Sequence, residues 1–437
     1  MKNNKATFSK YLVSGVAALA LTAGMATGAS AAENGKFRVG IVTFLSGAAA
    51  GPFGVPSANA AKVLVEALNK GELPAPYDKM GINGVEIEAV IIDEAGGATK
   101  QVEEYRNLVQ RQKVDAVIGY VSSGDCLAIA PVAEELKTFT IAYDCGTPRL
   151  FADNADAQYM FRTGLDASVD NIGAARYLVA TRPDVTRLSG IQQNYSWGQD
   201  SWADFTAAAA KLLPESEIVE EQFPKIYQGQ YGAEISALSV KRPEIVHSSF
   251  WGGDMEALVL QANARGLLED ATGLLTCGEA SFATYKDQAP NGMIIGARGP
   301  FGAFAPDNAL NTWFKGAYTA AYDLDPVYPA TKMAQAILGL KFAAENSGIA
   351  DKEIPTAEQL ASGIKGATFE SVSGTVEMAR ANGHQAMQGI TYGEYHYEDD
   401  KASIVNKVSF SGECVTPPEG VSAAEWIAEG FPGAQCN

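Results

Sequence analysis

DAVIGYVSSGDCLAIAPVAEEL, residues 115–136, joins an apolar, strand-like run to a helix-like run. Two serines and a glycine lie in VSSGDC (121–126), where a buried strand is expected to end and a helix to begin. Such a turn suits a phosphate-binding loop, a serine nucleophile, or a helix N-terminus that binds a carboxylate. The rest of the chain has to decide between these three.

Strand-like and helix-like segments alternate along most of the chain. KFRVGIVTFL (36–45) and VEIEAVIIDE (85–94) are apolar and rich in β-branched residues, and QVEEYRNLVQRQ (101–112) has helical periodicity. The alternation restarts after FRTGLDAS (161–168), and a strand-like pair ends the chain. Near-continuous apolar strands that alternate with helices predict parallel sheets covered on both faces. We therefore expect an α/β protein with two Rossmann-like lobes.

The N-terminus has the pattern of an export signal. A lysine-containing start precedes the apolar run YLVSGVAALALTAGMA (11–26), and an A-x-A site ends at Ala31. We predict that residues 1–31 are removed and that the protein resides in the periplasm. Removing 31 residues from 437 leaves 406, and losing three lysines takes the net charge from −18 to −21. Such an acidic chain disfavours nucleic acid and anionic lipid as partners.

Five cysteines in an exported chain predict disulfides with one thiol left over. Cys414 and Cys436 bracket a Pro/Gly-rich tail, Cys126 and Cys145 lie one strand–helix–strand step apart, and Cys277 is the candidate free thiol. Spacing does not fix the connectivity, and a nucleophilic Cys126 or Cys145 is the alternative. Neither a C-x-x-C motif nor a Cys/His cluster with metal spacing occurs. We predict no metal site and no cofactor.

The enzymatic alternatives for the turn lack their motifs. G-x-x-x-x-G-K-[ST], G-x-G-x-x-G after a strand and G-x-S-x-G are all absent. The three histidines, His247, His384 and His396, lie outside the strand-end loops that can form a cleft. What remains is passive anion binding at a helix N-terminus by Ser122 and Ser123, with helix capping as the simpler alternative.

Other predicted strand-end loops carry acidic and aromatic side chains. Ligands of open α/β sheets bind at the carboxyl ends of the strands, so two facing lobes place these loops on both walls of a cleft. Asp144 and Glu279 can face a ligand ammonium there, although either can be a cap or a surface acid. Rings that can line such a pocket, or belong to the core, are Tyr143, Tyr195, Trp197, Phe250 and Trp251.

The order of these segments resembles the substrate-binding proteins of branched-chain-amino-acid-type ABC importers, the leucine/isoleucine/valine-binding group with the type I periplasmic fold. The resemblance rests on KFRVGIVTFLSG, VIGYVSSG, IAYDCGTPRL, FRTGLDAS and NGMIIGARGP, and spans the chain beyond the signal. It implies a three-strand hinge that joins lobe 1 (32–163 plus 296–380) to lobe 2 (164–295 plus 381–437). It also implies a monomer that delivers solute to an inner-membrane permease.

The same resemblance assigns roles to individual residues. Ser122 and Thr147, helped by Ser123, would hold a ligand carboxylate, and Glu279 would face its amino group. The aromatic pocket positions correspond to Phe53, Trp197 and Trp251. YDC (143–145) and VSSGDC (121–126) add acids and bulk beyond the family pattern, so the ligand is left open.

The prediction is therefore a periplasmic solute-binding protein of an ABC importer, not an enzyme. It captures a small amino-acid-like or carboxylate- or amine-bearing solute by closing its cleft. A ligand sensor that docks to a membrane receptor is the alternative, and an exported hydrolase is a distant third.

Overall fold

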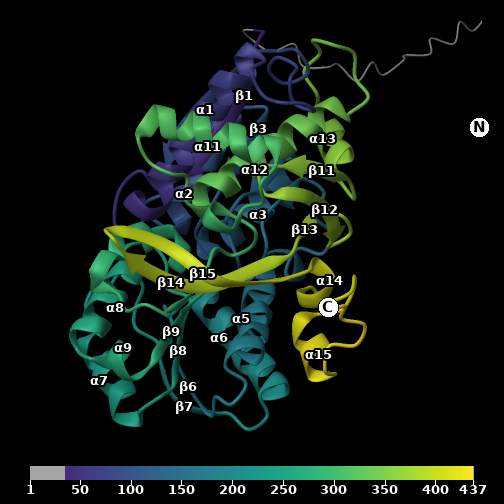
Figure 1. Cartoon of the computed structure of the whole chain (residues 1–437). Helices are drawn as coiled ribbons and strands as arrows, with labels where there is room; N and C mark the ends of the chain where they lie inside the picture. Colours follow the sequence, from purple (N-terminus) through teal and green to yellow (C-terminus); the bar gives the residue numbers. More distant parts are fainter. Residues whose placement is uncertain (1–34, 437) are drawn as a thin grey trace, which may run out of the picture.

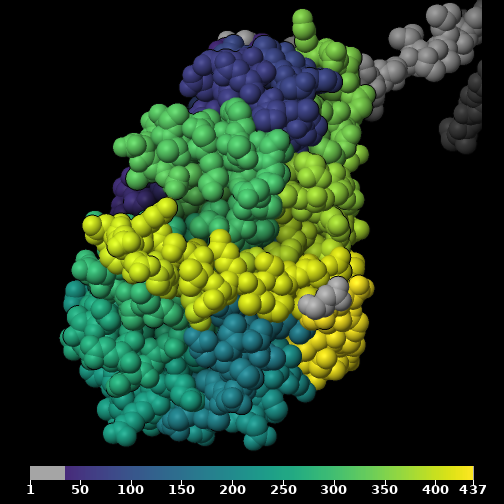
Figure 2. Space-filling view, in the orientation of Figure 1, coloured from purple at the N-terminus to yellow at the C-terminus, as the bar shows by residue number. Residues whose placement is uncertain are grey.

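The computed structural model describes residues 35–436, so the predicted signal peptide and its cleavage site lie outside the described residues. Two α/β lobes are stacked in Figure 1, one drawn in purple, blue and green and the other mainly in teal. In the space-filling view a yellow C-terminal band crosses the face of the molecule where the two lobes meet (Figure 2). Within the described range no helix has the length and apolar character needed to cross a membrane.

Lobe 1 is built on an eight-stranded sheet in the order β11-β12-β13-β5-β4-β3-β1-β2. Its central strands are almost wholly buried because helices cover both faces, which explains their continuous apolar sequence. The strands are β1 (Phe37–Thr43), β2 (Ile87–Asp93), β3 (Ala116–Gly119), β4 (Thr140–Ala142), β5 (Met160–Arg162), β11 (Thr368–Ser371), β12 (Gly374–Arg380) and β13 (Gln385–Met387).

The helices of lobe 1 include the C-terminal helical pair. Helix α1 ends at Gly71, which takes the left-handed conformation (φ 68°) typical of a glycine at a helix C-terminus. Helix α12 is buried along nearly its whole length and packs on α1 and α13. The helices are α1 (Val55–Lys70), α2 (Ala98–Arg106), α3 (Ser123–Leu136), α4 (Arg149–Ala152), α11 (Ala309–Tyr322), α12 (Tyr328–Glu345) and α13 (Ala357–Ile364), with short turns η1 (Ala50–Gly54), η2 (Asn107–Arg111) and η5 (Gly302–Phe304).

Lobe 2 is built on a seven-stranded sheet in the order β15-β14-β10-β9-β8-β6-β7. Its strands are β6 (Arg187–Ile191), β7 (Glu217–Gln222), β8 (Ile245–Ser248), β9 (Thr272–Leu275), β10 (Ile294–Gly296), β14 (Ile390–Glu398) and β15 (Lys401–Phe410). Its helices are α5 (Ala167–Thr181), α6 (Ser196–Leu212), α7 (Gly232–Lys241), α8 (Gly253–Ala264), α9 (Leu267–Asp270), α10 (Phe282–Tyr285), α14 (Gly412–Val415) and α15 (Ala423–Ala428), with η3 (Gly278–Ser281) and η4 (Lys286–Gln288).

The predicted two-lobed α/β fold is confirmed, and both sheets are mostly parallel. The C-terminal strands are the exception, because β11–β12 and β14–β15 are antiparallel hairpins. Only Asp399 and Asp400 separate β14 from β15, and both have positive φ (49° and 60°). A two-residue turn of this kind leaves no room for the helical crossover that a parallel pair requires.

The chain passes between the lobes three times, as expected for a three-strand hinge. It crosses after β5, returns after β10, and crosses again between β13 and β14. The third crossing comes later than the predicted boundary at 380/381, because β13 pairs with β5 in the sheet of lobe 1. Sheet pairing therefore extends lobe 1 to Met387 and restarts lobe 2 at Ile390.

Both predicted cysteine pairs form disulfides. Cys126 is bonded to Cys145 beside the first turn of α3, and Cys414 is bonded to Cys436 in the C-terminal tail. Cys277 is a buried free thiol. The thiol chemistry considered for Cys126 or Cys145 has no free sulfur to act with in this structure.

Candidate functional site

The carboxyl ends of the parallel strands of both lobes face one another, and the lobes are in contact. The backbone N–H of Gly253, at the start of α8, donates to the carbonyl of Ala48 in lobe 1 (2.8 Å). The hydroxyl of Thr147 donates to Asp200 of lobe 2 (2.7 Å). These contacts describe a closed cleft lined by strand-end loops, the position that parallel α/β sheets favour for ligands.

A cavity of about 460 Å³ remains between the closed lobes, and we call it the cleft cavity. This volume is within the range of small-molecule sites. From lobe 1 it is lined by the loop after β1, the loop after β2 and the first turn of α3; from lobe 2 it is lined by Tyr195, Ile226 and Tyr227. Ser122 and Asp125 supply polar groups, and Phe44 supplies an apolar ring.

A second, deeper space next to the cleft cavity is filled by aromatic side chains. Trp251 packs against Phe53 (ring centroids 5.3 Å apart), and Phe53 packs edge-on against Tyr328 (5.3 Å). The indole N–H of Trp251 donates to the hydroxyl of Tyr195 (2.7 Å). Only about 10 Å³ is left among these rings and Trp197, roughly the room needed by one water molecule.

The turn at residues 121–125 already holds a carboxylate that belongs to the protein. Ser122 is the N-cap of α3, and its N–H donates to Glu94 Oε1 (2.8 Å). The N–H of Val121 donates to both oxygens of Glu94 (2.9 and 3.0 Å). Glu94 is fully buried; burial first, and then Asp125, raise the pKa of its carboxyl well above the usual value.

The other predicted carboxylate-binding groups are also engaged within the protein. The Ser123 hydroxyl accepts from the N–H of Thr147 (3.2 Å), and the Thr147 hydroxyl donates to Asp200. Tyr143 is buried, with its hydroxyl 2.7 Å from that of Thr43 on β1. In this closed form these groups bond to each other instead of facing open space.

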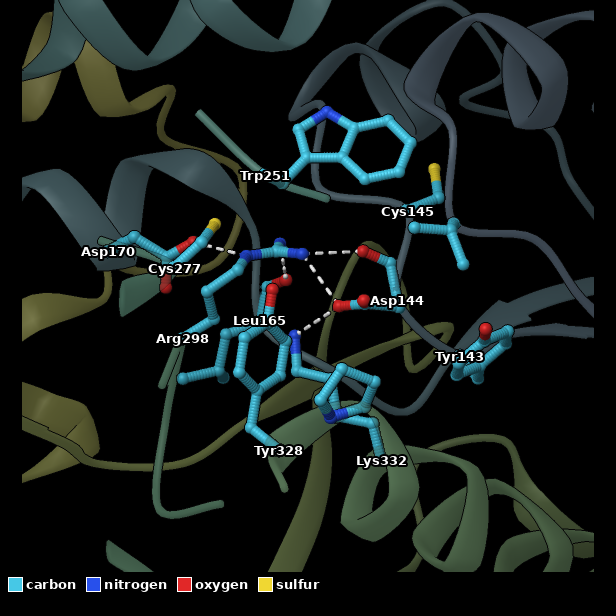
Figure 3. A network of polar contacts seen from close by, with 12 residues as sticks. Tyr143, Asp144, Cys145, Leu165, Asp170, Trp251, Cys277, Arg298, Tyr328 and Lys332 are labelled. Carbon is cyan, nitrogen blue, oxygen red and sulfur yellow. Dashed lines mark hydrogen bonds and ion pairs between the residues drawn. The ribbon is translucent and has the colours of Figure 1, made fainter. Parts of the chain in front are cut away.

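Asp144 belongs to a buried charge network centred on Arg298 (Figure 3). Arg298 Nη1 donates to the Asp144 carboxylate (2.7 Å) and backbone carbonyl (2.6 Å), and its Nε donates to Asp170 (3.0 Å). Lys332 of α12 donates to the same Asp144 oxygen (2.8 Å). The guanidinium also stacks on the ring of Trp197, 4.3 Å from its centroid.

The network joins both lobes through the hinge. Arg298 lies in the second crossing, Asp144 and Lys332 belong to lobe 1, and Asp170 belongs to α5 of lobe 2. Burial alone would lower the pKa of Arg298, but Asp170 and Asp144 hold it well above its usual value. Burial and then Arg298 lower the pKa of Lys332. The positive charges of two cations therefore balance the negative charges of two carboxylates in an interior shielded from solvent.

Glu279 connects η3 of lobe 2 to the hinge and to lobe 1. Its Oε1 accepts from the N–H of Ala303 and its Oε2 from the N–H of Tyr328, both at 2.7 Å. Burial raises the pKa of its carboxyl to about 7. A Cβ at Gly302 would lie 2.1 Å from Oε1, so glycine is required beside it. Its predicted role toward a ligand amino group stays a prediction.

The structure thus brings Phe53, Ser122, Tyr195, Trp197 and Trp251 together around the closed cleft. Phe250, in contrast, packs against Tyr231 within lobe 2 (5.0 Å between ring centroids). Sequence reasoning missed the functional candidates Glu94, Asp125, Tyr227, Arg298 and Tyr328. The signal that can find Arg298 is an arginine in the otherwise apolar and glycine-rich stretch NGMIIGARGPF.

Comparisons with known proteins fit this geometry. A model of the periplasmic binding protein family matches residues 36–400. The chain belongs to this family. It is therefore a binding protein, as the sequence predicts, rather than an enzyme. The leucine-specific-binding protein of Salmonella typhimurium is 24% identical over 290 residues, which cover 66% of this chain and 72% of that relative.

Solved structures share the fold of this periplasmic binding protein at low sequence identity. A solute-binding protein of an ABC transporter from Rhodopseudomonas palustris, in complex with 3,4-dihydroxybenzoic acid, has a TM-score of 0.74 and 19% identity, covering 86% of this chain and 98% of that one. A branched-chain amino acid transporter substrate-binding protein from Streptococcus pneumoniae, in complex with isoleucine, has a TM-score of 0.68 and 18% identity, covering 86% and 99%.

Proposed function

We propose that this periplasmic binding protein is the solute-binding component of an ABC importer. It captures a small solute between its lobes in the periplasm and delivers it to an inner-membrane permease. The observation that carries the proposal is the 460 Å³ cavity, open on one side, between two lobes that three chain crossings connect. The structural neighbours, which are solute-binding proteins of transporters, support it.

The predicted site residues divide into two groups in this proposal. Ser122 and Tyr195 line the cleft cavity that a solute enters. Trp251, Phe53 and Trp197 fill the deeper space behind it. Thr147, Asp144 and Glu279 bond to the other lobe or to the hinge and stabilise the closed arrangement. Ser123 and Tyr143 bond within lobe 1 and hold the cleft wall in place. Solute drives closure through the contacts that it makes only when both lobes reach it.

Closure can be tested by locking the lobes together. A Cβ at Gly253 would lie 3.4 Å from the Cβ of Ala48, close to the separation of about 3.8 Å that a disulfide spans. The variant Ala48→Cys/Gly253→Cys should therefore form a bond across the cleft when oxidised. Cys277 is buried in lobe 2 and does not compete. Ala48→Cys alone is the control.

A solute is first found by thermal shift of the refolded protein against amino acids, amines, aromatic acids and amides. At 100 times its dissociation constant a solute adds about 2.7 kcal/mol to the free energy of unfolding. The oxidised double variant should then neither take up nor release that solute, and reduction should restore exchange. Unchanged exchange in the oxidised variant would refute capture by lobe closure.

A further inference from the structure

The contacts that the sequence assigns to an amino-acid-like solute are filled by the protein itself. At the carboxylate end, the N–H groups of Val121 and Ser122 are taken by Glu94. At the ammonium end, Asp144 is paired with Arg298 and Lys332, and Glu279 accepts from the N–H groups of Ala303 and Tyr328. A zwitterion that entered the closed cleft would find both of its charged groups without a free partner at these positions.

The cleft cavity offers different chemistry from that deep position. Of the residues that line it, all within the described part of the chain, Asp125 is the one with a charged side chain. Asp125 is buried in the first turn of α3, and it lies close enough to Glu94 to help raise the pKa of the Glu94 carboxyl. The rings of Phe44, Tyr195 and Tyr227 form the other walls.

We propose that the cleft cavity selects a small organic cation, an ammonium on an apolar or aromatic body, that carries no carboxylate. This inference rests on the proposed function and names its solute class. Asp125 accepts a charge-assisted hydrogen bond from the ammonium, and the aromatic rings stabilise it through their π faces. A carboxylate is rejected because ionised Asp125 repels it and because Glu94 occupies the N–H donors of the turn.

Proton binding should be linked to solute binding. Burial raises the pKa of Asp125 to about 6, so a bound cation displaces a proton from it in mildly acidic solution. The other titratable groups near this carboxylate are Glu94, Tyr120 and Tyr227, and Tyr195 lines the same cavity. Amines with pKa values near that of lysine, about 10, stay charged over this range.

The test compares solutes that differ only in the carboxylate. Calorimetric titration of the refolded protein at pH 7.5 uses 2-phenylethylamine against phenylalanine and 3-methylbutylamine against leucine, with phenylacetate and 2-phenylethanol as the anionic and neutral analogues. Each amine should bind at least about tenfold tighter than its amino acid, and 2-phenylethylamine at least about tenfold tighter than 2-phenylethanol. Tenfold is the factor expected for one charge-assisted hydrogen bond. At pH 5 amine binding should be about tenfold weaker, because a pKa of about 6 leaves most Asp125 protonated.

Two variants assign the effect to residues. Asp125→Asn should weaken amine binding by about tenfold or more and remove the step in affinity centred near pH 6. Glu425→Gln is the matched control, because Glu425 is an acid in the first turn of another helix, α15, and is exposed. Its affinities should equal those of the wild type. Glu94→Ala frees the N–H groups of Val121 and Ser122. It should therefore reduce the ratio of amine affinity to phenylacetate affinity.

The outcomes separate this inference from the proposed function. Tighter binding of the amino acids or of phenylacetate, or an Asp125→Asn variant that binds amines normally, overturns the cation assignment and leaves solute capture standing. If neither amine binds but a solute of another class saturates the protein, the cation assignment is also overturned and solute capture still stands. If the locked variant exchanges solute freely, the proposed function falls and this inference falls with it.

Discussion

Replacing Arg298 by methionine tests whether the buried charge network stabilises the closed protein. The substitution keeps the length and apolar stem of the side chain but leaves Asp170 without its guanidinium partner (3.0 Å) and Asp144 with Lys332 alone. Removing one partner of a buried ion pair typically costs about 3–5 kcal/mol, because the other charge stays buried and unpaired. At about 2–4 °C per kcal/mol for a lobe of 150–250 residues, the melting temperature should fall by about 6–20 °C.

The assay is thermal unfolding followed by circular dichroism, with Arg106→Met as the matched control. Arg106 also makes a two-pronged pair with a glutamate, Glu135, but on the exposed surface, where such pairs contribute about 0–1 kcal/mol. The control should therefore melt within about 4 °C of the wild type.

The pH dependence distinguishes lost charge pairing from lost packing. Burial raises the pKa of Asp170, and Arg298 opposes that rise, so removing Arg298 should raise this pKa further. When folding raises the pKa of a group, the folded protein loses stability as pH rises towards that pKa. The deficit of Arg298→Met should therefore be larger at pH 7.5 than at pH 4.5. A deficit equal to that of Arg106→Met, or one independent of pH, would refute the reasoning.

Three further substitutions have outcomes that the structure sets. Burial raises the pKa of Glu279 to about 7. The free energy of unfolding of the wild type should therefore fall by about 3 kcal/mol as pH rises from 4.5 through 7. In denaturant titrations, Glu279→Gln should show a smaller fall over the same pH range. Burial lowers the pKa of His247 to about 3. The free energy of unfolding should therefore fall by about 5 kcal/mol as pH falls from 6.5 to 3, and His247→Gln should remove this part of the fall. Cys414→Ser/Cys436→Ser opens a loop of 22-residue separation and should cost about 2–4 kcal/mol, with earlier proteolysis of the tail; equal digestion would contradict a stabilising role.

The sequence was sufficient for the lobes because their signal is local. A strand buried on both faces, such as β3, is apolar throughout, and Ser122, a residue type favoured at helix N-termini, lies at the N-cap position of the helix that follows. The same logic places VSSGDC at a strand end and therefore at the cleft. The antiparallel pairing of β14 with β15 depends instead on the two-residue turn at Asp399 and Asp400.

The partners inside the cleft could not be read from spacing. Glu94 precedes the N–H group of Val121 by 27 residues, and Arg298 follows Asp144 by 154. Each of these contacts exists because two strand ends or a hinge segment meet in space. A motif search sees the serines as free donors and Asp144 as a free acid, since nothing local reveals that another part of the chain already satisfies them.

The contact between Glu279 and the backbone beside Gly302 also restricts how the chain can diverge. Gly302 has a φ of 55°, and a side chain there would occupy the place of the Glu279 carboxylate. A change at Glu279 alone loses the hydrogen bond to Ala303, and a change at Gly302 alone creates a steric clash with the Glu279 carboxylate. Across descendants of this sequence the two sites should therefore vary together, and a glutamate at 279 should always be accompanied by glycine at 302.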